Sequence, residues 1–105
     1  MKLIGLYKSG RKDKRFVFDY IDEDGKRKKI HFGLYKGSTY IDHQDKIKRK
    51  NYLARHSAGR EDWTKINPGS LSARLLWGDS VDLELNLKQY LKDFGFERSD
   101  YVFRV

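Results

Sequence analysis

The chain has 105 residues, and five of them most resemble the residues of an active site: His31, His43, His56, Asp42 and Asp45. A metal pair on one helix needs ligands three or four residues apart, because only then do both side chains point the same way. His43 and His56 are thirteen residues apart, so they cannot share one ion without ligands from elsewhere in the fold. Asp42 and Asp45 have a suitable spacing, but they stand where a helix is expected to begin, and helix capping explains both.

Other catalytic patterns are missing from the sequence. Ser70 and Ser72 have no adjacent histidine of a nucleophile motif, and no glycine-rich phosphate loop precedes a predicted helix. The chain contains no cysteine, which excludes a disulfide framework and a thiolate metal site. We therefore predict a protein that is not an enzyme and holds no metal and no cofactor.

Lysine and arginine provide the feature that points to a partner. The chain has 23 Lys and Arg against 15 Asp and Glu, a net charge of +8. Residues 1–57 hold 16 basic and 7 acidic residues (+9), whereas residues 58–105 hold 7 and 8 (−1). Such an uneven distribution predicts a surface that meets an acidic partner: nucleic acid first, then an anionic membrane or an acidic protein. A solvated basic surface with no dedicated ligand is the plain alternative.

Two basic runs are the candidate contacts with phosphate groups. The first run consists of Lys26, Arg27, Lys28 and Lys29, and the second of Lys46, Lys48, Arg49, Lys50 and Arg55. Basic side chains neutralise phosphates and release condensed counterions without any special geometry. Neither run belongs to a familiar major-groove module, and no aromatic motif of an RNA-binding sheet is present. We expect the two runs to act together in binding nucleic acid without sequence specificity.

The elements that must position these residues begin with three predicted strands. Residues 2–8 are rich in aliphatic side chains, and residues 16–21 and 28–33 alternate with a period of two. The turn at residues 22–25 ends in a glycine that can adopt a positive φ, which predicts a hairpin. The shared apolar face of this hairpin holds Phe16, Phe18, Tyr20, Ile30 and Phe32.

A helix of about four turns is predicted over residues 43–58, which contain no glycine or proline. Asp42 is its expected cap. The helical pattern places Ile47 and Ala54 on the side that faces the protein body and Tyr52 on the far side.

Two further helices and a last strand complete the predicted fold. Asn67 or Ser70 caps a short helix that ends at Trp77, and Asp79 or Ser80 caps a third helix that ends at Gly95. The buried stripe of the third helix comprises Leu83, Leu87, Tyr90, Leu91 and Phe94. Residues 101–105 alternate and predict an edge strand, and both tryptophans, Trp63 and Trp77, are expected in the core. The result is one α+β domain, a small and mainly antiparallel sheet with about three helices packed on one face.

Several blocks of this sequence resemble a known family. They are Lys28-Lys29-Ile30-His31-Phe32-Gly33, Asp42-His43, Lys48-Arg49, Asn51-Tyr52, Arg55-His56, Trp63 and Leu71-Ser72-Ala73-Arg74-Leu75-Leu76-Trp77-Gly78. Their order is similar to that in small basic proteins encoded by large nucleocytoplasmic DNA viruses of protists and algae. The resemblance runs from about Arg15 to Phe94. It implies an origin in a viral particle or an infected host cell, in its cytoplasm or nucleus, and it brings no catalytic residues with it.

Two apolar features predict self-association. Tyr52 and His56 lie four residues apart on the predicted helix, and Tyr101 and Phe103 lie on the predicted edge strand. Exposed strand edges and exposed aromatic side chains tend to be buried against another chain, and a two-fold homodimer is the commonest way to bury them. Acidic virion proteins are the alternative partner, for a structural role in the particle. The short apolar stretch at the N-terminus predicts neither a signal peptide nor a membrane partner.

Overall fold

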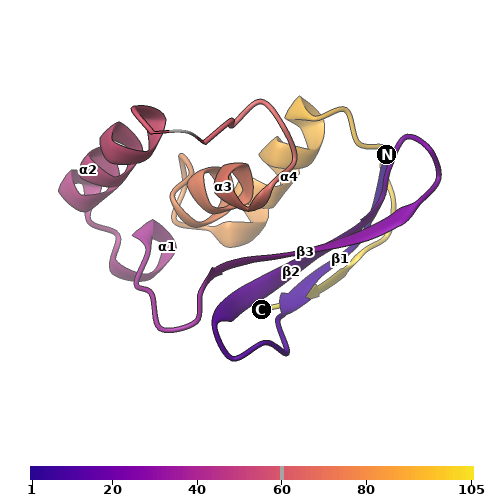
Figure 1. The fold of residues 1–105 in the computed structure, drawn as a ribbon, viewed down its shortest axis with the longest axis horizontal. Helices are drawn as coiled ribbons and strands as arrows, with labels where there is room; N and C mark the ends of the chain where they lie inside the picture. The colour runs from indigo at the N-terminus through magenta and orange to yellow at the C-terminus, as the bar shows by residue number, and fades with distance from the viewer. Residues whose placement is uncertain (60) are drawn as a thin grey trace.

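The structure is a computed structural model that describes residues 1–59 and 61–105. It shows an α+β fold in which a four-stranded sheet is covered by helices on one face (Figure 1). The strands are β1 (Lys2–Lys8), β2 (Lys14–Ile21), β3 (Arg27–Leu34) and β4 (Val102–Arg104). The helices are α1 (Tyr40–His43), α2 (Lys46–Ser57), α3 (Pro68–Leu71), the π-helix η1 (Ser72–Leu76) and α4 (Leu83–Asp93).

The sheet has the strand order β3-β2-β1-β4 and is antiparallel except at one edge. In the β2–β3 hairpin Phe16 lies opposite Phe32 and Phe18 opposite Ile30, so the predicted hairpin is confirmed. Gly25 adopts a φ of +80° in the connecting turn. The C-terminal strand β4 is at the edge, as predicted, and pairs parallel to β1.

The core lies between the sheet and the helical segment that contains α3, η1 and α4. Period-two alternation turns every second strand residue towards the helices, and on β2 and β3 these residues are Phe16, Phe18, Tyr20, Ile30 and Phe32. The buried side chains of the sheet are Leu3, Leu6, Phe16, Phe18, Tyr20 and Phe32. Those of the helical segment are Leu71, Leu75, Leu76, Trp77, Leu83, Leu87 and Tyr90. The predicted stripe of the third helix and the predicted burial of Trp77 are therefore confirmed.

Helix ends follow local hydrogen bonding. Asn67, one of the two predicted caps, accepts a hydrogen bond from the backbone N–H of Ser70 at 2.8 Å. The cap of α4 is Asp82, which accepts from the backbone of Glu84 at 3.0 Å, so the predicted caps Asp79 and Ser80 were wrong. The loop before α4 is two or three residues longer than expected, because the Ser80 hydroxyl accepts from the backbone N–H of Asp82 and prolongs the turn.

The predicted helix over residues 43–58 is divided in two. Gln44 adopts a left-handed conformation with a φ of 57°, which ends α1. Asp45 then begins α2, since its carboxylate accepts from the backbone N–H groups of Ile47 (2.9 Å) and Lys48 (3.1 Å). Asp42 does not cap the long helix, because it lies in the first turn of α1 and faces Thr39 and Arg15.

The orientation of α2 is the reverse of the predicted one. Ile47 is 73% exposed, whereas Tyr52 and Leu53 pack against the core. The sequence pattern favoured the aliphatic stripe, but the protein body offers α2 the flat ring of Trp77, which lies 4.2 Å from the ring of Tyr52. Stacking of two large rings buries more apolar area than a lone isoleucine does.

Candidate nucleic-acid interface

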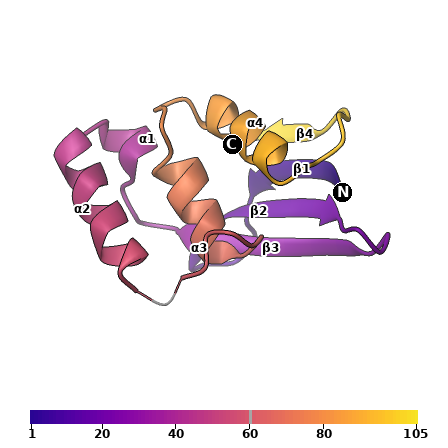
Figure 2. The same cartoon turned by 90° about the horizontal axis from the view of Figure 1, so that it is seen from above.

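The two basic runs lie at opposite ends of the molecule. The β2–β3 turn is at one end of the sheet, and α2 is beyond the other end (Figure 2). The longest dimension of the protein is 39 Å. The two runs therefore do not form one continuous surface, and only a ligand as long as the protein itself contacts both.

Three of the nine predicted phosphate contacts are held by acids of the same chain. Arg27 donates two hydrogen bonds to Asp19, at 3.0 and 2.8 Å, and Lys28 lies 3.1 Å from Asp22. Arg49 donates to Asp79 at 3.0 Å and to the carbonyl oxygens of residues 77 and 78 at 3.1 and 2.8 Å. Arg27 and Lys28 link β3 to β2 and to the turn within the hairpin, whereas Arg49 fastens α2 to the segment after η1.

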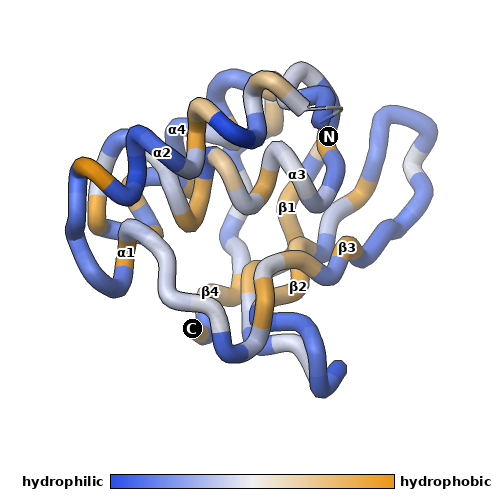
Figure 3. The backbone as a smooth tube through the Cα atoms, turned by 60° about the vertical axis from the view of Figure 1, so that its left-hand side comes forward, coloured by the Kyte–Doolittle hydropathy of each residue, from blue (hydrophilic) through white to orange (hydrophobic). Residues whose placement is uncertain are grey.

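The other six predicted contacts form no ion pair with any residue in 1–59 or 61–105: Lys26, Lys29, Lys46, Lys48, Lys50 and Arg55. Four of them lie on α2, which contains no acidic residue between Lys46 and Ser57. Most residues of α2 are hydrophilic (Figure 3). The end of the molecule that carries α2 thus has the denser positive charge.

Two adjoining cavities lie beside α2, and we call them together the α2 groove. Their volumes are about 450 and 280 Å³, and both are lined by Ser38, Arg55 and Trp77. The larger cavity also takes Lys14 of β2 and the residues at the end of β3, while the smaller one takes His43, Lys48 and Asn51. Sequence reasoning missed Lys14, Ser38 and Asn51, because only tertiary packing brings β2 and the β3–α1 connection against α2.

Aromatic rings form one wall of the α2 groove. Tyr52 stacks on Trp77 with an angle of 4° between the rings, and His56 stacks on the other side of Tyr52 at 4.0 Å. His43 contacts Trp77 at a ring-centre distance of 5.2 Å. Burial raises the pKa of Tyr52 to about 12, so the phenol stays neutral and does not repel an anion.

The structure keeps the three histidines apart. His31 lies on the sheet face away from the helices, where it shares a hydrogen bond of 2.7 Å with the Ser9 hydroxyl. His43 and His56 are separated by the rings of Trp77 and Tyr52, and His56 pairs with Glu61. In the described part of the chain, no three His, Asp or Glu side chains gather in a way that could hold a metal ion.

The residues predicted for a dimer interface have partners within the same chain. Tyr52 and His56 belong to the aromatic wall, the Tyr101 hydroxyl donates to Glu84 at 3.3 Å, and Phe103 packs against the core. None of these contacts tests the dimer, which stays a prediction.

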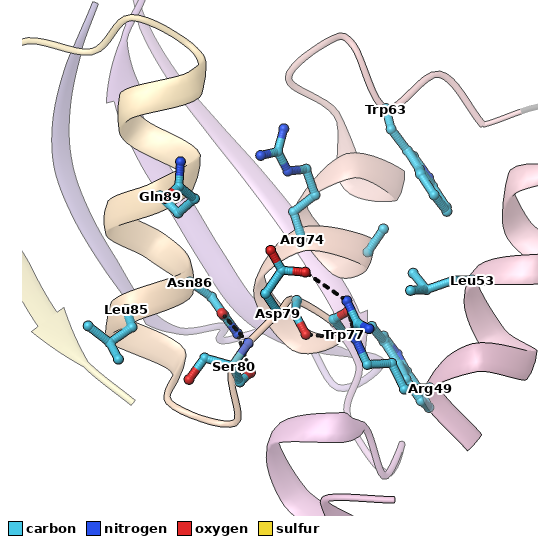
Figure 4. A pocket seen from close by; sticks show the side chains of 12 residues that line it. Arg49, Leu53, Trp63, Arg74, Trp77, Asp79, Ser80, Leu85, Asn86 and Gln89 are labelled. Atoms are coloured by element: carbon cyan, nitrogen blue, oxygen red, sulfur yellow. Dashed lines mark hydrogen bonds and ion pairs between the residues drawn. The ribbon is translucent and has the colours of Figure 1, made fainter. Parts of the chain in front are cut away.

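A third cavity of about 530 Å³ lies between α2 and α4 (Figure 4). Its two arginines are engaged, since Arg49 pairs with Asp79 and Arg74 with Asp93. Trp63 lines this cavity instead of joining the core cluster, which corrects the prediction for this residue. Its buried indole N–H has no hydrogen-bond partner among the residues that the structure describes.

None of the helices in the described ranges has the length and apolar composition needed to cross a membrane. No curated protein and no solved structure matches the chain. A family model does match, over residues 4–56, which include most of β1, both basic runs and nearly all of α2. The match starts before the region in which we noted a viral resemblance, and it ends before Trp63 and the block at residues 71–78. With half of its length matched, the chain belongs to this family of unknown function, DUF5754.

Proposed function

We propose that the protein binds nucleic acid without sequence specificity, through α2 and the α2 groove. The observation that carries this proposal is the row of four basic side chains on α2 that have no acidic partner in the described structure: Lys46, Lys48, Lys50 and Arg55. Such side chains are free to exchange their counterions for backbone phosphates, and the released ions drive binding.

Base recognition is not part of the proposal. The rings of Tyr52 and Trp77 already stack on each other, and Trp77 is buried, so neither face is open to a nucleobase. A protein that contacts only phosphates binds all sequences about equally. Affinity in the micromolar range at moderate salt is expected for this class of contact.

Fluorescence anisotropy with two duplexes of unrelated sequence tests the proposal across a series of salt concentrations. We expect equal affinities for the two duplexes and a logarithmic binding constant that falls linearly with the logarithm of the salt concentration. The double variant Lys46→Gln/Lys50→Gln should bind more weakly and lower the salt slope by about two, one for each lost phosphate contact.

The matched control is Lys88→Gln/Lys92→Gln, which removes the same charge from two exposed positions of α4. This control should keep most of the affinity. Equal losses in both double variants would show that net charge alone attracts the duplex, and a binding constant that does not change with salt would contradict the proposal.

A second candidate function is binding of an acidic protein, and exposed apolar side chains favour it. Ile47 on α2 is 73% exposed, and Leu34 and Tyr35 at the end of β3 are 69% and 63% exposed. Apolar side chains beside unpaired cations are typical of a protein-binding surface. Replacing Tyr35, which lies outside the α2 groove, by Ser should weaken the binding of an acidic protein and leave duplex binding unchanged, which separates the two candidates.

The viral setting is also a proposal, and it rests on the resemblance of the sequence blocks alone. It places the protein in the virion or in the infected host cell, where it packs nucleic acid or holds acidic virion proteins together. Mass spectrometry of purified particles tests it. Absence of the protein from particles and from infected cells would contradict it.

A further inference from the structure

We infer that the smaller cavity of the α2 groove is a phosphate-binding pocket formed by His43, Lys48, Asn51 and Arg55. This inference deepens the proposed function and rests on it for the molecule that carries the phosphate. The cavity of about 280 Å³ is large enough to admit a phosphate group together with water.

The residues from α2 point into this cavity because of their spacing. Lys48, Asn51 and Arg55 stand at positions i, i+3 and i+7 of the helix, which places them on one face. All three line the cavity. Neither Lys48 nor Arg55 pairs with an acid of the described chain, so two full positive charges face the same space.

His43 at the end of α1 adds a ring N–H donor to the lining. Its Nδ1 atom accepts a hydrogen bond from the backbone N–H of Asp45 at 2.9 Å, so in the neutral ring the proton is on Nε2. The Nε2 atom is buried and has no hydrogen-bond partner among the described residues. A buried donor without an acceptor is costly, and an anion that enters the cavity removes that cost when the His43 ring turns Nε2 towards it.

The lining contains no acidic side chain. Its remaining members are Ser38, whose hydroxyl can donate, and the apolar ring of Trp77. Two acids lie near it: Glu61 lines the adjoining cavity and pairs with His56, and the Asp45 carboxylate at the start of α2 lies near Lys48 and His43 without lining the cavity. Donors that approach from three chain segments match an anion with several oxygens, and phosphate accepts such bonds from all sides.

The first experiment uses inorganic phosphate as the probe. In ¹H–¹⁵N spectra of the full chain, titration with sodium phosphate should shift the Nε2 signal of His43 in a saturable way. Sodium chloride at equal ionic strength should not shift it, and the signals of His31 and His56 should stay in place. A linear shift without saturation, or equal shifts with chloride, would overturn the inference.

Two variants at positions two residues apart on α2, and so on different faces of the helix, provide the second readout. Lys48→Gln should weaken phosphate binding at least about tenfold, the effect of losing one charge-assisted hydrogen bond. Lys50→Gln removes the same charge outside the pocket, so it should weaken duplex binding while the phosphate affinity stays the same. Equal effects of the two variants on phosphate affinity would contradict a defined pocket.

Single-stranded oligonucleotides distinguish the two sources of the phosphate group. Tighter binding of a 5′-phosphorylated strand than of its unphosphorylated copy assigns the pocket to a terminal phosphate. Equal binding of both strands, with competition by inorganic phosphate, assigns it to the internal backbone.

Failure of the inference and failure of the proposed function have different signatures. If duplexes bind with the expected salt dependence but phosphate does not shift His43, the pocket is refuted and the function stands. If phosphate shifts His43 and no nucleic acid binds, the pocket stands and the proposed function is refuted.

Discussion

Asp42 shows what single charged residues do in this protein. Its carboxylate accepts two hydrogen bonds from Arg15, both at 2.7 Å, and two from Thr39, both at 2.8 Å. It thereby ties β2 to α1 across 27 residues of sequence. Asp19, which is 1% exposed, accepts hydrogen bonds from Tyr7 and Arg27 and so joins β2 to β1 and β3 on the far face of the sheet. Many charges of this chain therefore serve its structure.

Replacing Asp42 by Asn should lower the free energy of unfolding by about 1–2 kcal/mol, because the ion pair with Arg15 is lost and partial exposure screens its strength. Urea unfolding measures this loss at several pH values. The Arg15 guanidinium holds the pKa of Asp42 well below its usual range. The contribution is therefore fully present above the usual pKa of an aspartate, and it is lost as the pH falls below that value.

The difference between wild type and Asp42→Asn should thus be constant near neutral pH and shrink in acid. A difference that grows as the pH falls below 4 would contradict this assignment. The variant Asp45→Asn is a useful comparison, because asparagine also caps helices and the cost should be smaller.

Arg27 and Lys29 are neighbours in one basic run, but we expect different effects from their replacement. Arg27→Gln should destabilise the protein by about 1–3 kcal/mol, because it leaves the buried carboxylate of Asp19 without its charged partner. Lys29→Gln, which breaks no ion pair with a described residue, should change stability by less than about 0.5 kcal/mol. Thermal unfolding compares them directly, and equal shifts in Tm would show that the Arg27–Asp19 pair has no structural role.

At the scale of elements, α2 is fastened by its polar and aromatic residues. Arg49 reaches the backbone after η1, and Tyr52 stacks on Trp77. The aliphatic Ile47 faces away from the body. This arrangement leaves the basic side chains of α2 on the outside, where a partner can meet them.

The variant Tyr52→Ala should reduce the free energy of unfolding by about 2–3 kcal/mol, since a large ring is removed from between Trp77 and His56. Ile47→Ala on the same helix should have an effect within about 0.5 kcal/mol. Chemical denaturation of the two variants measures the difference. A larger loss for Ile47→Ala would mean that α2 packs by its aliphatic stripe after all.

For the whole molecule, the exposed edge of the sheet at β4 is the feature that bears on self-association. The edge strand β4 has only three residues and pairs with β1 on one side alone. Val102 and Val105 at this edge are 44% and 48% exposed. An exposed apolar edge favours pairing with another chain.

We expect a homodimer that forms through the β4 edge, with a mass that rises with concentration in light-scattering experiments. The variant Val102→Lys should shift the equilibrium towards the monomer, because a charge on the edge opposes strand pairing. Lys50→Gln on α2 is a suitable control, because α2 lies apart from β4 (Figure 2). A monomeric mass at every concentration would contradict the dimer.

Much of the fold was determined by local sequence. The alternation of Phe16, Phe18 and Tyr20 and the glycine of the turn specify the β2–β3 hairpin, because strand burial has a period of two and few residues tolerate a positive φ. The stripe of α4 and its end at Gly95 follow in the same way from the helical period and a C-terminal glycine. The uneven charge is likewise a property of composition, visible before folding.

The orientation of α2, the pairing of its charges and the α2 groove were decided by the tertiary structure, because they depend on contacts between segments that are distant in sequence. The reversed face of α2 depends on Trp77, which lies far from it in sequence. Three of the nine basic candidates, Arg27, Lys28 and Arg49, are neutralised by acids that the fold brings near. The pocket at His43 exists only because the β3–α1 connection is folded against α2. The spacing of hydrophobic residues predicts which side chains are buried. Only the packing of distant segments determines which basic side chains are left without an acidic partner.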